Sequence, residues 1–84
     1  MGKIDSAVFT SLRNAENAPV TVLIICTEKC FLVKTRLMAV GVVVTAIVND
    51  LNTLTARIML EDVILLESDP DILRIELDAT VTAG

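Results

Sequence analysis

Four segments of the chain have the hydrophobic pattern of β-strands. Residues 19–26 and 42–48 are short apolar runs rich in Val and Ile, which is typical of buried strands. Residues 53–60 and 71–78 instead alternate apolar and polar positions, as strands do when only one face is buried. The sequence Asn-Asp-Leu-Asn at 49–52 favours a turn between the second and third strands, because Asn and Asp tolerate turn geometry.

A short helix is expected near the N-terminus, before the first strand. Val8, Phe9 and Leu12 recur there at helical spacing. Asp5 or Ser6 can cap the start of this helix with a side-chain oxygen. The helix is therefore expected to bury one face and to precede the main body of the fold.

A second helix is expected within residues 28–41, with Thr27 as its cap. Its core face is predicted to carry Cys30, Val33, Leu37 and Val40. Gly41 suits the C-terminal end of this helix. A third helix is expected within residues 61–70, where acids occupy the first turn and Pro70 marks the end.

These elements follow in the order β-α-β-β-α-β after the short first helix. That order predicts a ferredoxin-like α+β fold, in which a four-stranded antiparallel sheet carries both later helices on one face. At a length of 84 residues the chain is expected to form one domain over residues 1–78. Residues 79–84 are expected to form an extended C-terminal tail.

Strand alternation assigns side chains to the two faces of this sheet. The helix-covered face is predicted to receive Leu54, Ala56, Ile58, Leu60, Leu73, Ile75 and Leu77. The opposite face is predicted to combine the polar residues Thr55, Arg57, Arg74 and Glu76 with Leu23, Ile25, Val43, Thr45 and Ile47. From this face we expect an interaction surface that includes Thr45, Ile47, Thr55, Arg57 and Arg74, unless the tail or the first helix folds over it.

Composition and charge narrow the classes of function. Hydrophobic residues make up 54% of the chain, so it has enough apolar surface to offset the entropy cost of folding. Residues 1–60 carry six basic and four acidic groups, whereas residues 61–84 carry Arg74 against seven acids. This acidic C-terminal third argues against nucleic acid as a partner. The longest apolar run, 38–48, is too short to cross a bilayer, so a membrane is not expected either.

No catalytic, metal or cofactor site is expected. The sequence has no His, no nucleophile motif and no glycine-rich phosphate loop. Cys26 and Cys30 are separated by three residues, which is not the spacing of a redox motif, and a zinc ion would lack ligands. We expect two ordinary, partly buried thiols, with a disulfide between a strand end and a helix start as the alternative.

Pairs of acids occur three times in the C-terminal third. The pairs at 61–62 and 69–71 are expected to start a helix and to form a turn. Glu76 and Asp78 differ, because they project from the same face of the last strand immediately before the tail. These two carboxylates, roughly 7 Å apart, are interpreted either as a solvated strand face or as acceptors for the helix N-termini of a partner.

The run VNDLNTLTARIMLEDVILLESDPDILRIELD resembles the second half of the propeptides of subtilisin-like serine proteases. That family shows a strand, a small-residue turn, a second strand and a short helix that ends in an acid-Pro pair. A last strand then ends in an apolar-acid-x-acid motif. The opening KIDSAVFTSLRNAENAPVTVLII is also similar to the first part of pro-domains from some archaeal members, so the resemblance spans nearly the whole chain.

The resemblance implies a mode of action. Propeptides of this family pack their open sheet face on two surface helices of the protease, and their acid-x-acid pair, matched here by Glu76 and Asp78, caps those helices. Their C-terminal segment occupies the substrate cleft like a cleaved product. That role would fall to Ala79, Thr80, Val81, Thr82, Ala83 and Gly84. Gly84 would take the primary specificity position and Val81 the fourth position back.

The resemblance therefore implies a protease inhibitor and folding chaperone rather than an enzyme, with a subtilisin-like serine protease as its partner. It would be secreted with its protease if it is an excised pro-domain, or cytoplasmic if it is a free-standing protein. The alternative is an ACT-like regulatory module that dimerises through the apolar sheet and binds a small metabolite. Self-association through the open face is also expected of an inhibitor whose partner is missing.

Overall fold

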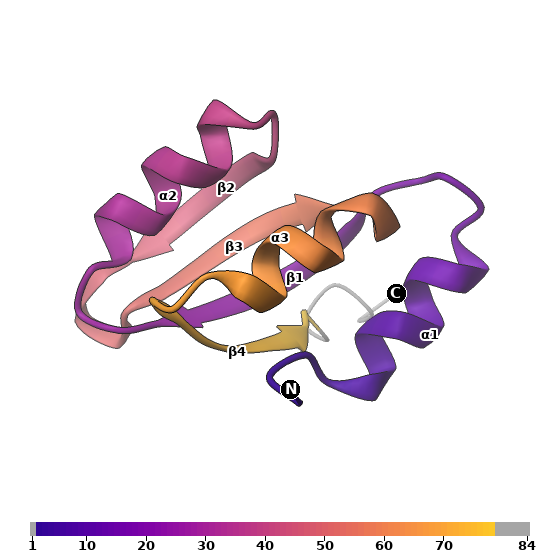
Figure 1. Cartoon of the computed structure of the whole chain (residues 1–84), viewed down its shortest axis with the longest axis horizontal. Helices are drawn as coiled ribbons and strands as arrows, with labels where there is room; N and C mark the ends of the chain where they lie inside the picture. Colours follow the sequence, from indigo (N-terminus) through magenta and orange to yellow (C-terminus); the bar gives the residue numbers. More distant parts are fainter. Residues whose placement is uncertain (1, 79–84) are drawn as a thin grey trace.

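The computed structural model describes residues 2–78, which form one sheet with helices packed against it (Figure 1). The sheet has four strands in the order β2-β3-β1-β4, and every neighbouring pair is antiparallel. The strands are β1 (Val20–Cys26), β2 (Val43–Val48), β3 (Thr53–Ile58) and β4 (Ile72–Leu77). This is the ferredoxin-like α+β arrangement that the order of elements predicted.

The helices are shorter than the sequence pattern suggested. They are α1 (Ser6–Asn14), α2 (Cys30–Ala39) and α3 (Val63–Ser68), with two 3-10 turns, η1 (Asn49–Leu51) and η2 (Leu60–Asp62). None of the helices within residues 2–78 is long and apolar enough to cross a membrane.

Local chemistry explains where α2 begins and ends. Lys29, rather than Thr27, holds the N-cap position, but the Thr27 hydroxyl accepts a hydrogen bond from the Lys29 amide at 3.3 Å. At the other end, Gly41 has a φ of 92°, a left-handed value that glycine adopts without steric cost. The predicted role of Gly41 as a helix stop is therefore confirmed.

The hydrophobic core lies between the helices and one face of the sheet. The sheet contributes fully buried side chains from Val22, Ile24, Leu54, Ala56, Ile58 and Ile75. The helices contribute Val8, Leu12, Cys30, Val33, Leu37 and Leu66 to the same cluster. Because α1 shares this core with α2 and α3, it does not fold over the opposite face of the sheet.

Leu73 was predicted to point into the core, and this prediction is wrong. The β1–β4 register shifts between Ile25 and Cys26, so that Cys26 pairs with Ile72 while Ile25 pairs with Arg74. Leu73 is the extra residue of this irregularity and is 57% exposed, whereas Ile72 is buried. Beyond the shift the expected alternation holds, since Ile75 is buried.

Two other apolar residues that were predicted to face the core are exposed instead. Leu60 is 54% exposed, because β3 ends at Ile58 and the chain turns into η2 before Leu60 could continue the strand alternation. Val40 is 56% exposed, because α2 has already ended and the backbone no longer follows the helical spacing. Both errors arise where a periodic pattern was extended past the end of its element.

Residues 42–48 were expected to form a buried strand, but β2 lies at an edge of the sheet. Its pairing with β3 contains a second irregularity. The register shifts between Val44 and Ala46, which leaves Thr45 in a bulge where its hydroxyl donates to the Thr55 carbonyl at 3.2 Å. Beyond the shift, Ile47 lies opposite Leu54 and packs against the core. The prediction that Ile47 faces away from the helices is therefore wrong.

The two edges of the sheet differ. The outer edge of β4 is covered by the N-terminal segment, since the Ile75 amide donates to the Lys3 carbonyl at 2.8 Å and the Asp5 amide donates to the Ile75 carbonyl at 2.9 Å. Ile4 forms the corresponding parallel bridge with Ile75. The outer edge of β2 pairs with no other strand of the described chain.

Candidate functional site

The face of the sheet opposite the helices is the candidate interaction surface, and we call it the open face. Directly paired residues of adjacent strands project to the same side, so the register defines its members. The central strands contribute Thr21, Leu23, Ile25, Thr53, Thr55 and Arg57. β4 adds Arg74 beside Ile25 and Glu76 beside Leu23. β2 adds Val43, Ala46 and Val48.

Every residue of the open face is exposed or half-buried, and none belongs to the hydrophobic core cluster. Leu23 and Ile25 lie at its centre, between threonines on β3 and the charged residues of β4. Val43 and Val48 extend the apolar area to the edge and are 53% and 43% exposed. An apolar centre with a polar surround is typical of a protein interface.

Of the residues predicted for the interaction surface, Thr55, Arg57 and Arg74 lie on the open face. Thr45 lies in the bulge, and Ile47 faces the helices. Ala46 and Val48 lie on the open face without having been predicted there, because the bulge reverses the alternation within β2. No feature of the sequence marks this bulge, so strand alternation alone could not have identified them.

The two acids at the end of β4 lie close to this surface. Glu76 Oε2 forms an ion pair with Arg74 Nε at 2.7 Å. The Glu76 side chain is 34% exposed and the Arg74 side chain 62% exposed. An exposed pair of this kind contributes little to stability and can rearrange. The Asp78 amide donates to the Thr21 carbonyl at 3.2 Å, which continues the β1–β4 register one residue past the strand. By alternation Asp78 follows Glu76 on the open side.

The remaining predicted protease-binding residues, 79–84, lie outside the described residues. What the structure does establish is the position from which they start. Leu77 ends β4 beside Val22 of the central strand β1, and Asp78 is still bonded to β1. The C-terminal segment therefore begins at the sheet, directly after the two acids.

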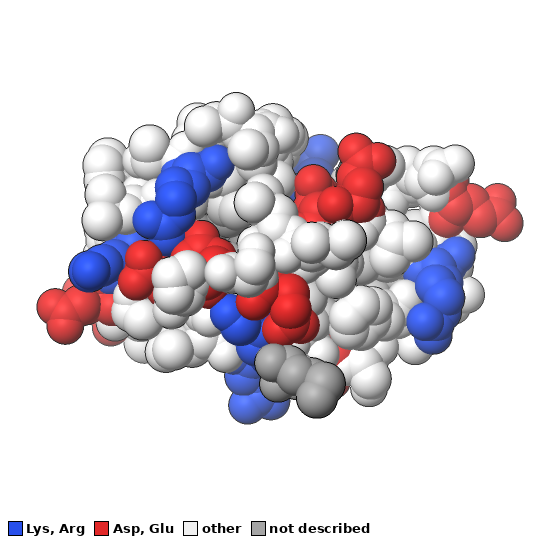
Figure 2. Space-filling model, in the orientation of Figure 1, with Lys and Arg blue, Asp and Glu red and all other residues white. Residues whose placement is uncertain are grey.

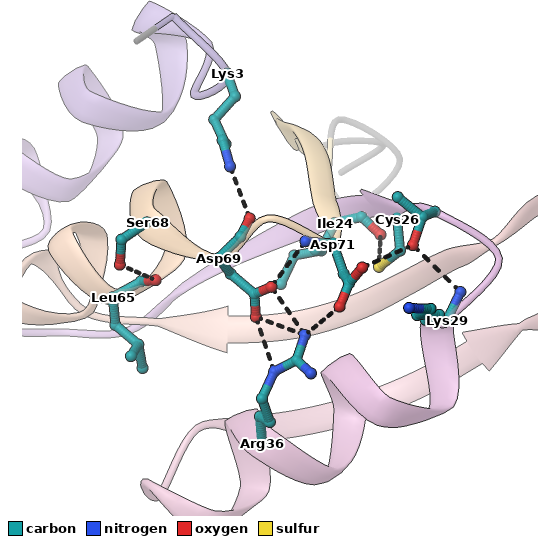
Figure 3. A network of polar contacts seen from close by, with 10 residues as sticks. Lys3, Ile24, Cys26, Lys29, Arg36, Leu65, Ser68, Asp69 and Asp71 are labelled. Atoms are coloured by element: carbon teal, nitrogen blue, oxygen red, sulfur yellow. Dashed lines mark hydrogen bonds and ion pairs between the residues drawn. The ribbon is translucent and has the colours of Figure 1, made fainter.

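A second polar group lies on the helix side of the sheet, where Arg36 of α2 bonds the turn between α3 and β4 (Figure 3). Its guanidinium donates to Asp69 Oδ1 at 2.8 Å and to Asp71 Oδ2 at 3.0 Å. These bonds, first to Asp71 and then to Asp69, raise the pKa of Arg36 above its ordinary value. The turn role predicted for the acids is confirmed, because the Asp71 amide donates to Asp69 Oδ1 at 2.9 Å.

Further contacts join the same turn to the rest of the fold. Lys3 donates to the Asp69 carbonyl at 2.8 Å (Figure 3). The Thr27 hydroxyl donates to Asp71 Oδ1 at 3.3 Å. The Thr27 amide also donates to the Asp71 carbonyl at 2.8 Å. Sequence reasoning missed the partner Arg36, which is 33 residues from Asp69 and carries no local signal of this contact. The polar groups of this cluster satisfy one another and hold the turn in place.

A groove of about 350 Å³ opens between α2 and α3 beside this cluster. It is lined by Arg36, Leu37, Leu65, Ser68, Asp69 and Pro70. Its one cationic lining residue, Arg36, is already bonded to two carboxylates. A charged metabolite would have to compete with that ion pair, which makes the groove a weaker candidate than the open face.

The two cysteines are free and buried, so the structure contains ordinary thiols rather than the alternative disulfide. Burial, reinforced by the neighbouring Cys30, raises the pKa of the Cys26 thiol to about 12. Such a thiol is protonated and unreactive at neutral pH. Within residues 2–78, no cluster of three or more His, Cys, Asp or Glu side chains that could hold a metal ion occurs.

Comparison of the chain with protein-family models, with curated protein sequences and with solved structures found no significant match. The site is therefore interpreted from its own geometry, which combines a sheet face that nothing within residues 2–78 covers, two acids at its end and a chain segment that follows them directly.

Proposed function

We propose that the protein is a propeptide-like inhibitor and folding chaperone of a subtilisin-like serine protease, which it binds through the open face. The observation that carries this proposal is the position of Glu76 and Asp78. They lie at the end of β4, beside an uncovered sheet face and immediately before the C-terminal segment. One docking event can then place a sheet, two carboxylates and the C-terminal segment on the same partner.

The dimensions of the open face suit a pair of helices. Four strands at about 4.8 Å spacing span roughly 15 Å between the outer strands, and two packed helices have axes about 8–10 Å apart. Leu23 and Ile25 on the midline of the sheet would enter the apolar seam between such helices. In this proposal the same surface stabilises the helix pair of the protease while the protease folds, and this is the basis of the chaperone role.

The two acids supply the charge for such a contact. Helix N-termini present unbonded amides and a partial positive charge, which carboxylates at the end of β4 can satisfy. To bind a helix end, the Glu76 carboxylate has to keep Arg74 as a second partner or release it. Either change costs little free energy, because the ion pair is exposed. Asp78 is one step further along the same side of the chain.

In this proposal, residues 79–84 add to the substrate cleft as an extended strand. Main-chain hydrogen bonds would supply the affinity, and the sequence Ala-Thr-Val-Thr-Ala-Gly offers small side chains that fit a narrow groove. Val81 is the largest apolar side chain among them and is the candidate for an apolar subsite. Gly84 would lie at the primary specificity position, next to the catalytic serine.

The proposal is tested by titrating a subtilisin-type protease with the full chain and following residual peptidase activity together with digestion of the added chain. We expect competitive inhibition that fades as the protein is digested. A chain that stays intact and leaves activity unchanged at millimolar concentration contradicts the proposal.

Two variants separate the contributions. Glu76→Gln/Asp78→Asn should weaken inhibition by about 10- to 1,000-fold, because charge-assisted bonds to helix ends are lost. The matched control Glu28→Gln/Glu61→Gln removes the same charge from exposed residues outside the open face and should leave inhibition unchanged. Deleting residues 80–84 should abolish cleft blockage while calorimetry still detects docking; equal inhibition by the truncated chain would exclude the cleft role.

A further inference from the structure

The outer edge of β2 is an unpaired strand edge in the described chain. β4, the other edge strand, is covered by residues 3–5, whereas β2 pairs only with β3 within the described chain. Natural edge strands are commonly blunted by Lys, Pro, inward-pointing charges or β-bulges. The sequence of β2, Val-Val-Thr-Ala-Ile-Val, contains no Lys, Pro or charged residue, so the bulge at Thr45 is the one such feature on this edge.

The pattern of exposed and half-buried residues along β2 is symmetric about the centre of the strand. Val43 is exposed and Val44 half-buried at one end, while Val48 is exposed and Ile47 half-buried at the other. The bulge at Thr45 lies between them and reverses the alternation at the middle of the strand. As a result both terminal valines belong to the open face, and both inner aliphatic residues face the helices.

This symmetry suits antiparallel pairing of β2 with β2 of a second copy of the chain. Two antiparallel copies of β2, related by a two-fold axis between Thr45 and Ala46, bring Val43 opposite Val48 of the second copy. The same operation brings Val44 opposite Ile47 of the second copy. Each pair joins β-branched side chains on the same face of the combined sheet, and each occurs twice by symmetry. No pair places like charges opposite each other.

The neighbouring helix extends this surface. α2 packs beside β2, and Phe31 and Met38 on α2 are 66% and 55% exposed. They lie on the flank away from α3, because Arg36 on the other flank reaches Asp69. The one charge on their flank, Lys34, lies 6.0 Å from the centroid of the Phe31 ring. Figure 2 shows the region over α2 and β2, at the upper left, as largely uncharged apart from basic side chains along the helix.

We propose that the protein forms a two-fold symmetric dimer through the edge of β2, which joins the two four-stranded sheets into one. A two-fold axis perpendicular to the sheet keeps both open faces on one side and both α2 helices on the other. Phe31 and Met38 of the two copies then lie across the axis from each other, where they lose water contact. The dimer leaves the open face uncovered, so this inference does not depend on the proposed function.

The pairing of Val43 with Val48 of the second copy makes the proposal testable by charge substitution. Val43→Lys/Val48→Lys places like charges opposite each other twice, whereas Val43→Lys/Val48→Glu places opposite charges there twice. Within one chain these positions are at opposite ends of β2, so the two variants differ little as monomers. Sedimentation velocity from micromolar to millimolar concentration measures the association of each, and circular dichroism verifies folding.

We expect the native chain and the Lys/Glu variant to dimerise and the Lys/Lys variant to dissociate about tenfold or more readily, a difference that shrinks at high salt. Leu23→Glu, at the centre of the open face, should leave the dimer intact. A native chain that is monomeric at millimolar concentration, or equal association of the two charge variants, overturns the proposal. Loss of the dimer in Leu23→Glu alone would assign self-association to the open face instead.

Discussion

At the scale of single residues, the Cys26 thiol has a strongly raised pKa. Cys26 is 2% exposed at the end of β1, and Cys30 is 3% exposed at the start of α2. The Cys26 thiol donates weakly to the Ile24 carbonyl at 3.6 Å. Burial penalises the thiolate and raises the pKa of Cys26 from 9.0 to about 12. Cys26 therefore acts as compact apolar packing rather than as a reactive thiol.

This pKa predicts a loss of stability in alkali. The folded chain keeps the Cys26 proton up to a pH of about 12, whereas the unfolded thiol releases it near 9.0. The stabilisation is thus complete below pH 9 and decreases above it, by at most about 1.4 kcal/mol per pH unit. Urea unfolding of the native chain and of Cys26→Ala measures the effect. The native chain should lose more stability above pH 9 than the variant, and parallel pH profiles would contradict the assignment.

At the scale of elements, the turn before β4 connects parts of the chain that are distant in sequence. Arg36 of α2 and Lys3 before α1 both bond to this turn (Figure 3). Thr27 after β1 bonds to Asp71. The Asp69 carboxylate also accepts the Asp71 amide, and its side chain is 10% exposed. The cluster therefore holds the turn from which β4 enters the sheet.

Removing the central carboxylate should loosen this connection. Asp69→Ala leaves the Asp71 amide without its acceptor and separates Arg36 from one of its two partners, so we expect a loss of about 2 kcal/mol in unfolding free energy. Asp50→Ala, in the exposed η1 turn, serves as the control and should change stability by less than about 0.5 kcal/mol. Equal effects of the two substitutions in urea unfolding would show that the cluster is not structurally important.

At the scale of the whole molecule, the sheet has one covered face and one uncovered face. The three helices share a single core on one side, and within residues 2–78 nothing packs on the other (Figure 1). Adjacent residues of β1 show the contrast, because Ile24 is fully buried while Ile25 lies on the open face. Residues 2–78 are therefore stabilised from one side of the sheet and leave the other side open to a partner.

The same substitution at these two neighbours tests this description. Ile24→Ala should cost about 2–5 kcal/mol, because it leaves a cavity in the core. Ile25→Ala should cost less than about 1 kcal/mol, because the side chain is only half-buried and water can replace it. Chemical denaturation of the two variants gives the comparison. A large loss for Ile25→Ala would indicate that part of the chain covers the open face.

Local periodicity was enough to predict the fold. The order of elements, the ferredoxin-like sheet and the buried positions Cys30, Val33 and Leu37 followed from spacing, because the side chains of a helix or strand repeat within a few residues. Part of the open face was predicted for the same reason, including Thr55 and Arg57 on the regular strand β3. The position of Glu76 before the C-terminal segment was likewise evident from the sequence.

The tertiary structure alone decided three features. Two register shifts turned Leu73 outward and Ile47 inward, because a bulge depends on the partner strand rather than on its own sequence. Arg36 bonds the carboxylates of Asp69 and Asp71, which are 33 and 35 residues away in the sequence, so no local spacing could predict this contact. The position of β2 at the edge of the sheet came from strand pairing between distant segments. The sequence by itself determined which faces of the helices and strands are apolar. The tertiary structure determined which of these faces stay exposed, because a face is buried only when another element packs against it.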